Sequence, residues 1–416
     1  MGDKIIFHID VNSAFLSWEA ADRLQHGDTL DLRDVPSVVG GDESKRHGIV
    51  LAKSIPAKKF NIKTGESLFS ARMKCSELII VPPNYNLYMR CSSALHQMLM
   101  EYSPYIQPFS VDEYFLDCTG MEKHFGSPLE TAHKIKNKIK KELGFTVNIG
   151  ISTNKLLAKM ASEFEKPDKV HTLFKHEIPQ KMWPLPVEDL FMVGRATVSK
   201  LHAKNIFTIG DLANTDPEFL KYWLKSHGLL IWQYANGIDN SDIKTGAYGL
   251  KGIGNSTTTA FDVQDKKTAN MVLLSLCETT AMRLRNANKC CRVVCVSLKD
   301  FKFNSYSHQK KLDLPTDCTN KIYQKACELF DEIWDGEPLR HMGVHLSELC
   351  ESDFYQVSMF EHELQKYKAL DRAIDEIRLK YGSSAIVRSC FLHSGLRPLM
   401  GCISDNASYP LMSSIL

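Results

Sequence analysis

The chain has 416 residues, of which 24% are charged and 44% hydrophobic, with 51 Lys and Arg against 49 Asp and Glu. This length suits two or three domains, and the near-average composition excludes a wholly disordered or collagen-like chain. A net charge of +2 means that any polyanionic partner must be met by a local basic patch, because the surface as a whole carries almost no excess charge.

Neither a membrane segment nor a cysteine-based metal site is indicated. No stretch of about 18 uncharged apolar residues occurs, and the N-terminus lacks a basic segment followed by a long apolar run. We therefore expect a cytoplasmic protein without a membrane partner. The 12 Cys contain no C-x-x-C pair, which favours buried, reduced thiols over a zinc or dithiol site.

The first 168 residues predict a mixture of strands and helices. Short apolar runs predict strands at 4–10, 37–39, 48–52, 78–81, 106–112, 113–117 and 146–151. Helical patterns cover 84–102 and 128–143; the second begins with the capping box Ser127-Pro128-Leu129-Glu130 and ends at Gly144. From Leu78 to Lys159 the order is strand, helix, two strands, helix, strand, which is typical of a ferredoxin-like split βαβ fold.

Beyond residue 168 the pattern changes. Short helices broken by glycines predict a small all-helical domain to about residue 242, followed by a linker. From Lys251 the order of strands and helices returns in outline, which indicates a second sandwich. Between residues 241 and 310, eleven Lys and Arg against five Asp and Glu give a local charge of +6. Residues after 350 are expected to form a tail with one amphipathic helix near 363–381.

Three carboxylates occupy predicted strand ends. Asp10 closes the first strand, and Asp112 and Glu113 lie at a turn between two later strands, which a split βαβ sheet can bring together. Clustered carboxylates need a cation, and Mg²⁺ prefers oxygen ligands. Two such ions can activate an attacking hydroxyl and stabilise a leaving oxygen. The residues alone leave a second interpretation open, in which Asp10 caps a helix and the acidic pair forms a solvated turn.

Three blocks of sequence carry the most specific pattern in the chain. They are Phe7-His8-Ile9-Asp10-Val11-Asn12-Ser13-Ala14-Phe15, Ser110-Val111-Asp112-Glu113-Tyr114-Phe115-Leu116-Asp117 and Gly150-Ile151-Ser152-Thr153-Asn154-Lys155-Leu156-Leu157-Ala158-Lys159. These blocks resemble the core motifs of the Y-family DNA polymerases, in the DinB/UmuC group, and the resemblance extends from about Lys4 to Leu349. It implies an α+β, multidomain right-hand polymerase. The implied parts are a ferredoxin-like palm (1–10 and 78–168), small fingers (11–77), a helical thumb with a helix-hairpin-helix (169–242), a βαββαβ little finger (243–350) and a C-terminal tail (351–416).

The resemblance implies a template-directed DNA polymerase that adds deoxynucleotides to a primer 3′-hydroxyl and acts in translesion synthesis. Asp10, Asp112 and Glu113 match the family's catalytic, metal-binding carboxylates, and the carbonyl of Val11 matches a further ligand of two Mg²⁺ ions. Phe15 matches the steric gate, an aromatic ring that a 2′-hydroxyl would strike. The short fingers segment predicts loose checking of the nascent base pair and tolerance of damaged templates.

A triphosphate site is implied as well. Free backbone donors and the dipole at a predicted helix start favour a triphosphate. These donors belong to Asn12, Ser13, Ala14 and Phe15. Lys159 matches a triphosphate-binding lysine. Lys58 stands where the family often has Arg, and Ile55 where many members have Tyr, so the phosphate clamp is expected to be weaker or differently built.

Two segments are similar to DNA-binding parts of the family. In the thumb hairpin, glycines let backbone amides approach a DNA phosphate; Gly194 keeps one of these glycines, but Met192 replaces the other. A second segment is similar to the start of the little finger. The residues expected to contact the DNA backbone there are Lys251, Ser256 and Thr257. A purely structural turn and a basic surface without a partner stay open as alternatives for the two segments.

Gln356-Val357-Ser358-Met359-Phe360 resembles the pentapeptide by which bacterial polymerases bind the sliding clamp, with Gln356 forming hydrogen bonds and Met359 and Phe360 filling an apolar pocket. The expected partners are primer–template DNA, deoxynucleoside triphosphates and the clamp, bound by a monomer. Two other functions stay open: a nucleotide cyclase, and a catalytically silent DNA- or clamp-binding protein. The predicted thumb and little finger count against the first, and the intact acidic set with Lys159 against the second.

Overall fold

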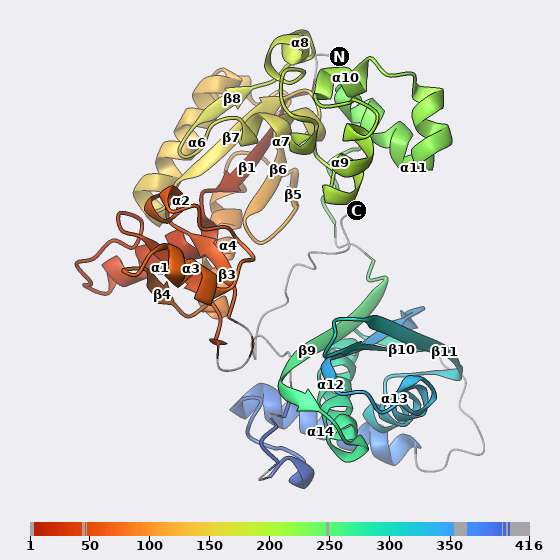
Figure 1. The fold of residues 1–416 in the computed structure, drawn as a ribbon. Coiled ribbons are helices and arrows are strands. Elements are labelled where there is room, and N and C mark those ends of the chain that lie inside the picture. The colour runs from red at the N-terminus through yellow and green to blue at the C-terminus, as the bar shows by residue number, and fades with distance from the viewer. Residues whose placement is uncertain are drawn as a thin grey trace.

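The computed structural model of the chain describes residues 4–43, 46, 48–246, 249–352, 364–392, 394–396 and 398–399. Its elements gather around a central five-stranded sheet, a small three-stranded sheet, a group of helices and a C-terminal five-stranded sheet. Figure 1 shows their arrangement. None of the helices in these ranges is both long and apolar enough to cross a membrane.

The N-terminal strand lies in the middle of the central sheet. The order of this sheet is β5 (Ile106–Pro108), β6 (Glu113–Asp117), β1 (Ile6–Val11), β7 (Val147–Ser152) and β8 (Val170–Thr172). β1 pairs antiparallel with both β6 and β7. All six of its residues are buried, as expected for a strand covered on both faces.

Helices cover both faces of this sheet and divide the side chains of β1 between them. Successive side chains of a strand point to opposite faces. Phe7 and Ile9 share a core with α4 (Tyr85–Leu99) and α6 (Pro128–Leu143). On the other face, Ile6 packs against Ala158 of α7 (Lys155–Glu163). Asp10, two positions on from His8 and four from Ile6, therefore faces α7.

The strand predicted at 78–81 belongs to a different sheet than expected. β4 (Ile79–Val81) pairs parallel with β2 (Ser37–Gly40), which also pairs with β3 (Val50–Lys53). The ferredoxin-like series in the central sheet is therefore β1, α4, β5, β6, α6 and β7, and its first strand is β1. The expectation that this series starts at Leu78 is wrong. A pattern of apolar residues predicts that a segment forms a strand, but it does not predict which sheet the strand joins. The palm segment expected to begin at residue 78 accordingly loses β4 to the small sheet.

Four further helices of the first 168 residues pack around the small sheet and at the periphery of the central sheet. They are α1 (Ala14–Gln25), α2 (Ile55–Lys59), α3 (Leu68–Lys74) and α5 (Glu122–Phe125). Predicted end signals are confirmed at α6, where Ser127 and Glu130 form the reciprocal capping box and Gly144 adopts the left-handed conformation that ends the helix.

The helical region expected from residue 169 begins only after β8, which belongs to the central sheet. From Lys175 to Ala235 the described elements are helical, and they pack directly on α7. These elements are η2 (Lys175–Glu177), α8 (Ile178–Lys181), η3 (Val187–Asp189), α9 (Arg195–His202), α10 (Ile209–Ala213) and α11 (Pro217–Ala235). Their core includes Leu156, Leu157 and Met160 of α7. The side chain of Asn154, which caps α7, also donates to the Gly237 carbonyl at 2.9 Å. One helix thus belongs to the sheet on one side and to the helical group on the other.

The C-terminal sheet repeats the βαββαβ order of elements but not the strand order. Its elements are β9 (Gly252–Val263), α12 (Lys266–Asn286), β10 (Lys289–Asp300), β11 (Ser305–Thr316), α13 (Thr319–Ile333) and β12 (Leu339–Ser347). The strands run β11-β10-β12-β9, with a short strand β13 (Cys350–Glu351) paired to β10. Leucine and valine side chains of the sheet, α12 and α13 form one core. β9 is an edge strand.

The segment after Ser352 is not a free tail over its described part. α14 (Leu364–Tyr381) and η4 (Ser389–Phe391) pack on this unit (Figure 1), and Phe391 and Leu396 join its core. Arg285 of α12 pairs with Asp375, and Lys368 pairs with Asp317 at 2.9 Å. The expected helix is confirmed, and it docks on the C-terminal sheet unit because charges spaced along α14 find partners there.

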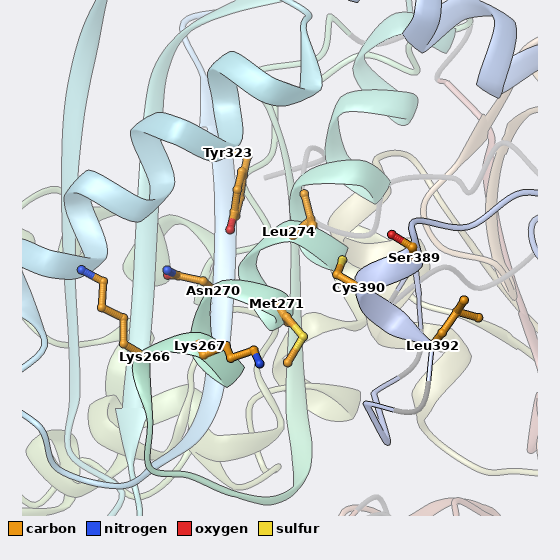
Figure 2. Close-up of a pocket in the computed structure, with 9 residues that line it drawn as sticks. All are labelled: Lys266, Lys267, Asn270, Met271, Leu274, Tyr323, Ser389, Cys390 and Leu392. Atoms are coloured by element: carbon orange, nitrogen blue, oxygen red, sulfur yellow. The ribbon is translucent and has the colours of Figure 1, made fainter.

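A cavity of about 760 Å³ lies where η4 meets the helices of this unit (Figure 2). Its walls come from α12, α13 and the η4 segment, and include Lys267, Asn270, Tyr323 and Cys390. No carboxylate predicted to be catalytic lines it.

Gly150 tests how tightly α7 must approach the sheet. A Cβ at this position would lie 1.9 Å from the Ala158 carbonyl oxygen and 2.5 Å from the Ser162 nitrogen. We expect Gly150→Ala to push α7 off β7 and to lower the free energy of unfolding by about 3 kcal/mol, measured by urea denaturation. Gly246→Ala is the control, because a Cβ there meets nothing within 4 Å. Equal stability of the two variants would contradict this close packing.

Candidate active site

Backbone pairing brings Asp10 and Glu113 together. In the antiparallel register of β1 and β6, Asp10 lies directly opposite Glu113. Such cross-strand neighbours have Cβ atoms about 5 Å apart. At the same edge, the Val11 N–H donates to the Asp112 carbonyl at 3.1 Å. Two residues that are distant in sequence therefore lie side by side on one face of the sheet, where β1 ends and β6 begins.

A third carboxylate comes from α7. Glu163 lies at the C-terminal end of this helix, and one oxygen each from Asp10, Glu113 and Glu163 falls within 4.8 Å of the other two. We call these three residues the acidic cluster. Within the described ranges, it is the one group of three or more His, Cys, Asp or Glu side chains close enough to hold a metal ion. The carboxylate oxygens suit a hard cation such as Mg²⁺.

Two lysines neutralise part of this charge. Lys166 Nζ lies 2.6 Å from an Asp10 oxygen and 2.9 Å from a Glu163 oxygen. Lys159 Nζ lies 2.7 Å from Glu113. Three carboxylates and two ammonium groups leave one negative charge without a partner in this group, so the cluster attracts cations. Lys166 itself bridges two of the carboxylates as a bound cation would.

Glu163 and Lys166 were not expected from the sequence. The signal that could have found Glu163 is helical spacing, since it follows Lys159 by four residues and therefore lies on the same face of α7. Lys166 lies beyond the end of α7, where no helical periodicity predicts its direction. Its place beside Asp10 is decided by the packing of the chain.

Burial controls the protonation of Asp10. Its side chain is largely enclosed, and this burial raises the pKa of Asp10 to about 6, against the opposing effect of Lys166. The charge of Glu113 contributes to the rise. Because a proton and a metal cation compete for the same carboxylate, cation binding at the cluster should weaken as the pH falls below about 6.

Asp112 lies beside the acidic cluster without belonging to it. Its carboxylate accepts a hydrogen bond from the Ser110 hydroxyl. Burial raises the pKa of Asp112, and the charge of Asp10 adds to the rise while the Ser110 hydrogen bond opposes it. The structure therefore brings two of the three predicted carboxylates into direct contact range and leaves the third turned toward Ser110.

His8 supports the cluster from within the sheet. Its buried ring places Nδ1 2.8 Å from the Ser162 hydroxyl and Nε2 4.0 Å from a Glu113 oxygen. Burial holds the pKa of His8 well below its usual value of 6.5, and the positive charges of Lys159 and Lys166 lower it further. The imidazole is therefore neutral at neutral pH and adds no charge to the site.

Phe15 is held rigidly beside the end of β1. Ser13, with φ 48° and ψ 50°, turns the chain from the strand into α1. The Phe15 ring stacks on Tyr88 of α4, with 4.3 Å between ring centroids and 7° between planes. Tyr85 meets the Phe15 ring edge-on at 6.2 Å. Two aromatic neighbours thus fix the ring in one position.

The start of α1 offers fewer free backbone donors than the sequence predicts. The Asn12 N–H donates to the Thr146 carbonyl at 3.0 Å, so it is already engaged. The first hydrogen bond within α1 runs from the Ser17 N–H to the Ser13 carbonyl. The N–H groups of Ala14 and Phe15 precede it and have no acceptor within the helix, as first-turn donors do.

The predicted basic and DNA-contacting residues lie in three different places. Lys58 is exposed on α2, by the small sheet. Gly194 caps α9, and a Cβ there would meet nothing within 4 Å. Met192 has φ 74°, a conformation that favours Gly, so the hairpin keeps the geometry of the glycine that Met192 replaces.

The predicted contacts on β9 do not share one face. Ser256 pairs with Gly343 and is exposed, whereas Thr257 pairs with Met342, which is part of the core. Side chains of neighbouring strand residues point to opposite faces, so Thr257 points toward the helices. Lys251 is exposed just before β9. The clamp-binding residues Gln356, Met359 and Phe360 lie outside the described residues.

Comparisons with known proteins agree with this arrangement. Residues 9–163 match a model of the impB/mucB/samB family, and residues 250–359 match that family's C-terminal domain. The chain is 50% identical to DNA polymerase IV of Clostridium acetobutylicum over 394 residues, which is 94% of this chain and 98% of the relative. It is 37% identical to DNA polymerase IV of Acetivibrio thermocellus, again over 94% of this chain and 98% of the relative.

A solved structure described as a Y-family DNA polymerase chimera superimposes with a TM-score of 0.72, covering 83% of this chain and 99% of the chimera at 21% identity. At this identity the match concerns the fold. Together with the relatives above, it confirms the family and the multidomain α+β fold expected from the sequence. The chain belongs to the impB/mucB/samB family and has the fold of a Y-family DNA polymerase.

Lys166 tests whether the acidic cluster binds cations. Removing this ammonium group removes a competitor for Asp10 and Glu163, so Lys166→Ala should bind Mg²⁺ more tightly in the absence of DNA, by up to about tenfold. Isothermal titration calorimetry measures the affinity. Lys169→Ala is the control for loss of one charge, because Lys169 pairs with Glu165 outside the cluster. An Mg²⁺ affinity of Lys166→Ala equal to that of Lys169→Ala, or weaker, would contradict cation binding at the acidic cluster.

Proposed function

We propose that this protein is a DNA-directed DNA polymerase that extends a primer 3′-hydroxyl with deoxynucleotides during translesion synthesis. The observation that carries the proposal is the acidic cluster. Asp10, Glu113 and Glu163 form it where the central strands β1 and β6 meet the end of α7. Relatives named DNA polymerase IV that align with 94% of this chain, at 50% and 37% identity, support the same activity.

The carboxylates define where the metal would bind. Asp10 and Glu113, with Asp112 and the Val11 carbonyl, would hold two Mg²⁺ ions, and Glu163 lies close enough to contribute. Mg²⁺ supplies positive charge that lowers the pKa of an attacking hydroxyl and stabilises a leaving pyrophosphate oxygen. The neutral His8 beneath the cluster adds no positive charge that would compete with a cation for these carboxylates.

The lysines are proposed to meet the triphosphate. Lys159 and Lys166 lie against the acidic cluster, so a triphosphate approaching it meets both ammonium groups. Lys58, on α2, would add charge from the small sheet as a point charge, without the bidentate fork of an arginine. The free N–H groups of Ala14 and Phe15 at the start of α1 favour the same anion.

Phe15 is proposed to select the sugar. The ring follows the Asp10 strand end by five residues and is clamped by Tyr88 and Tyr85. A ring that cannot rotate away leaves no room for a 2′-hydroxyl. In the described residues beside the small sheet, α2 and α3 are only five and seven residues long, too short to close over a base pair, which favours acceptance of damaged templates.

DNA contacts are proposed at two sites. The hairpin at Gly194 presents backbone amides that a phosphate can approach, since no side chain covers this residue. The edge strand β9 presents the exposed side chain of Ser256, with the exposed Lys251 next to it. Thr257 would contribute through its backbone, because its side chain faces the helices. The segment at Gln356, Met359 and Phe360 is proposed to bind the sliding clamp.

Asp112 tests the assigned chemistry. We expect Asp112→Ala to reduce primer extension to background because an Mg²⁺ ligand is lost, while binding of primer–template DNA, measured by fluorescence anisotropy, is kept. Glu122→Ala, which removes an exposed carboxylate on α5, should extend primers normally. Continued synthesis by Asp112→Ala would remove this carboxylate from the reaction.

Phe15 tests the sugar selection. We expect Phe15→Ala to lower the preference for deoxynucleotides over ribonucleotides by about a hundredfold, measured as the ratio of kcat/KM for the two substrates. Phe69→Ala is the control, because Phe69 is a 70% exposed phenylalanine on α3. An unchanged ratio in Phe15→Ala would assign the discrimination to another group.

A further inference from the structure

Helix α14 turns charged residues toward the protein. Four charged side chains recur at helical spacing on its buried side: Lys368, Asp371, Asp375 and Arg378. Each one pairs with a residue of the C-terminal sheet unit. The partners are Arg285 for both aspartates, Asp317 for Lys368 and Glu278 for Arg378. An ordinary amphipathic surface helix does the reverse and buries its apolar side.

The same helix carries apolar residues along another side. Leu370, Ile374, Ile377 and Tyr381 follow one another at spacings of four, three and four residues, which places them in one line along the helix. The exposed fractions of Leu370, Ile377 and Tyr381 are 51%, 37% and 67%. We call these four residues the apolar stripe. A contiguous apolar patch on a surface is typical of an interaction site.

The buried ion pairs keep the apolar stripe exposed. The side chains of Lys368, Asp371 and Arg378 are 9%, 8% and 5% exposed. Rotation of α14 to bury the stripe would leave these charges and their partners unpaired, at a large energetic cost. The stripe is therefore held outward by the residues that dock the helix.

We propose that the apolar stripe is a second contact for the sliding clamp, continuous with the segment Gln356–Phe360. The inference rests on the clamp binding proposed above. Three residues separate Phe360 from Leu364, the first residue of α14, and a connection of this length can span at most about 14 Å. Leu370 lies only about 9 Å from Leu364 along the helix axis. A clamp that binds the segment ending at Phe360 is therefore within reach of the first turns of α14.

The apolar stripe and the pentapeptide offer the same kind of contact, namely apolar side chains that a partner can bury. A pentapeptide that fills one pocket buries little surface, and stable interfaces bury more than about 1,000 Å² in total. A line of apolar side chains next to the pentapeptide adds anchors of the type that dominate interface energies. Because the ion pairs already fix α14, the added contact requires no new ordering of the helix.

The test compares two leucines on opposite sides of α14. Leu370 belongs to the stripe, and Leu379, 68% exposed, lies nine residues on and so half a turn away around the helix. With the full-length chain and purified sliding clamp, Leu370→Asp should weaken binding by at least about tenfold. Leu379→Asp should bind as the unaltered chain does. Both variants should keep the same thermal midpoint and the same primer extension without clamp.

Two results separate this inference from the function on which it rests. Equal clamp affinity of Leu370→Asp and Leu379→Asp, with binding lost in Phe360→Ala, would overturn the stripe contact and leave the clamp segment intact. Normal clamp binding by Phe360→Ala would overturn the clamp segment itself. A change of oligomeric state in Leu370→Asp, or tighter clamp binding after deletion of residues 400–416, would assign the stripe to a second copy or to the chain's own C-terminal segment.

Discussion

The site depends on how closely α7 packs against the central sheet. Because Gly150 on β7 has no side chain, the Ala158 carbonyl of α7 can lie close against the strand. Lys159 and Glu163 therefore reach the strand ends at which Asp10 of β1 lies opposite Glu113 of β6. The same helix contributes Leu156, Leu157 and Met160 to the core of the helical group. The position of α7 therefore sets both the geometry of the acidic cluster and the placement of the helical group that follows it.

The electrostatics of the site are those of a place prepared for a divalent cation. Lys159 and Lys166 stabilise the acidic cluster without fully neutralising it. Burial raises the pKa of Asp10, which is the cost of keeping a carboxylate in an enclosed site. His8 remains neutral. Lys166 bridges Asp10 and Glu163 where a divalent cation would bind, so with a cation bound its ammonium group would be available to an anion.

In the C-terminal unit, charged side chains pair with one another and hold two elements together instead of forming a site for a cation. Buried pairs such as Arg285 with Asp375 and Lys368 with Asp317 dock α14 on the sheet unit, whereas apolar side chains of the same helix face solvent. Buried ion pairs add little net stability compared with apolar packing, but they specify one orientation. These pairs fix α14 in an orientation that leaves its apolar side chains exposed. The family model for this unit ends at residue 359, before the helix begins.

Sequence alone determined the elements and the chemistry of individual residues. The capping box at Ser127, the βαββαβ order and the acidic strand ends follow from local rules, since caps and periodicity act over a few residues. The resemblance of three short blocks to a polymerase family determined the class of reaction. Met192 could also be recognised from sequence as a departure, although its φ of 74° shows that the turn itself is kept.

Tertiary structure alone decided which elements meet. Strand periodicity cannot assign β4 to the small sheet, and nothing local to Glu163 or Lys166 places them beside Asp10. The engagement of the Asn12 N–H by Thr146, the opposite facing of Ser256 and Thr257 and the inverted packing of α14 are likewise set by partners distant in the chain. The physical reason is common to all of them: register, close packing and buried charge pairing are properties of pairs of elements, and a single segment contains only half of each pair.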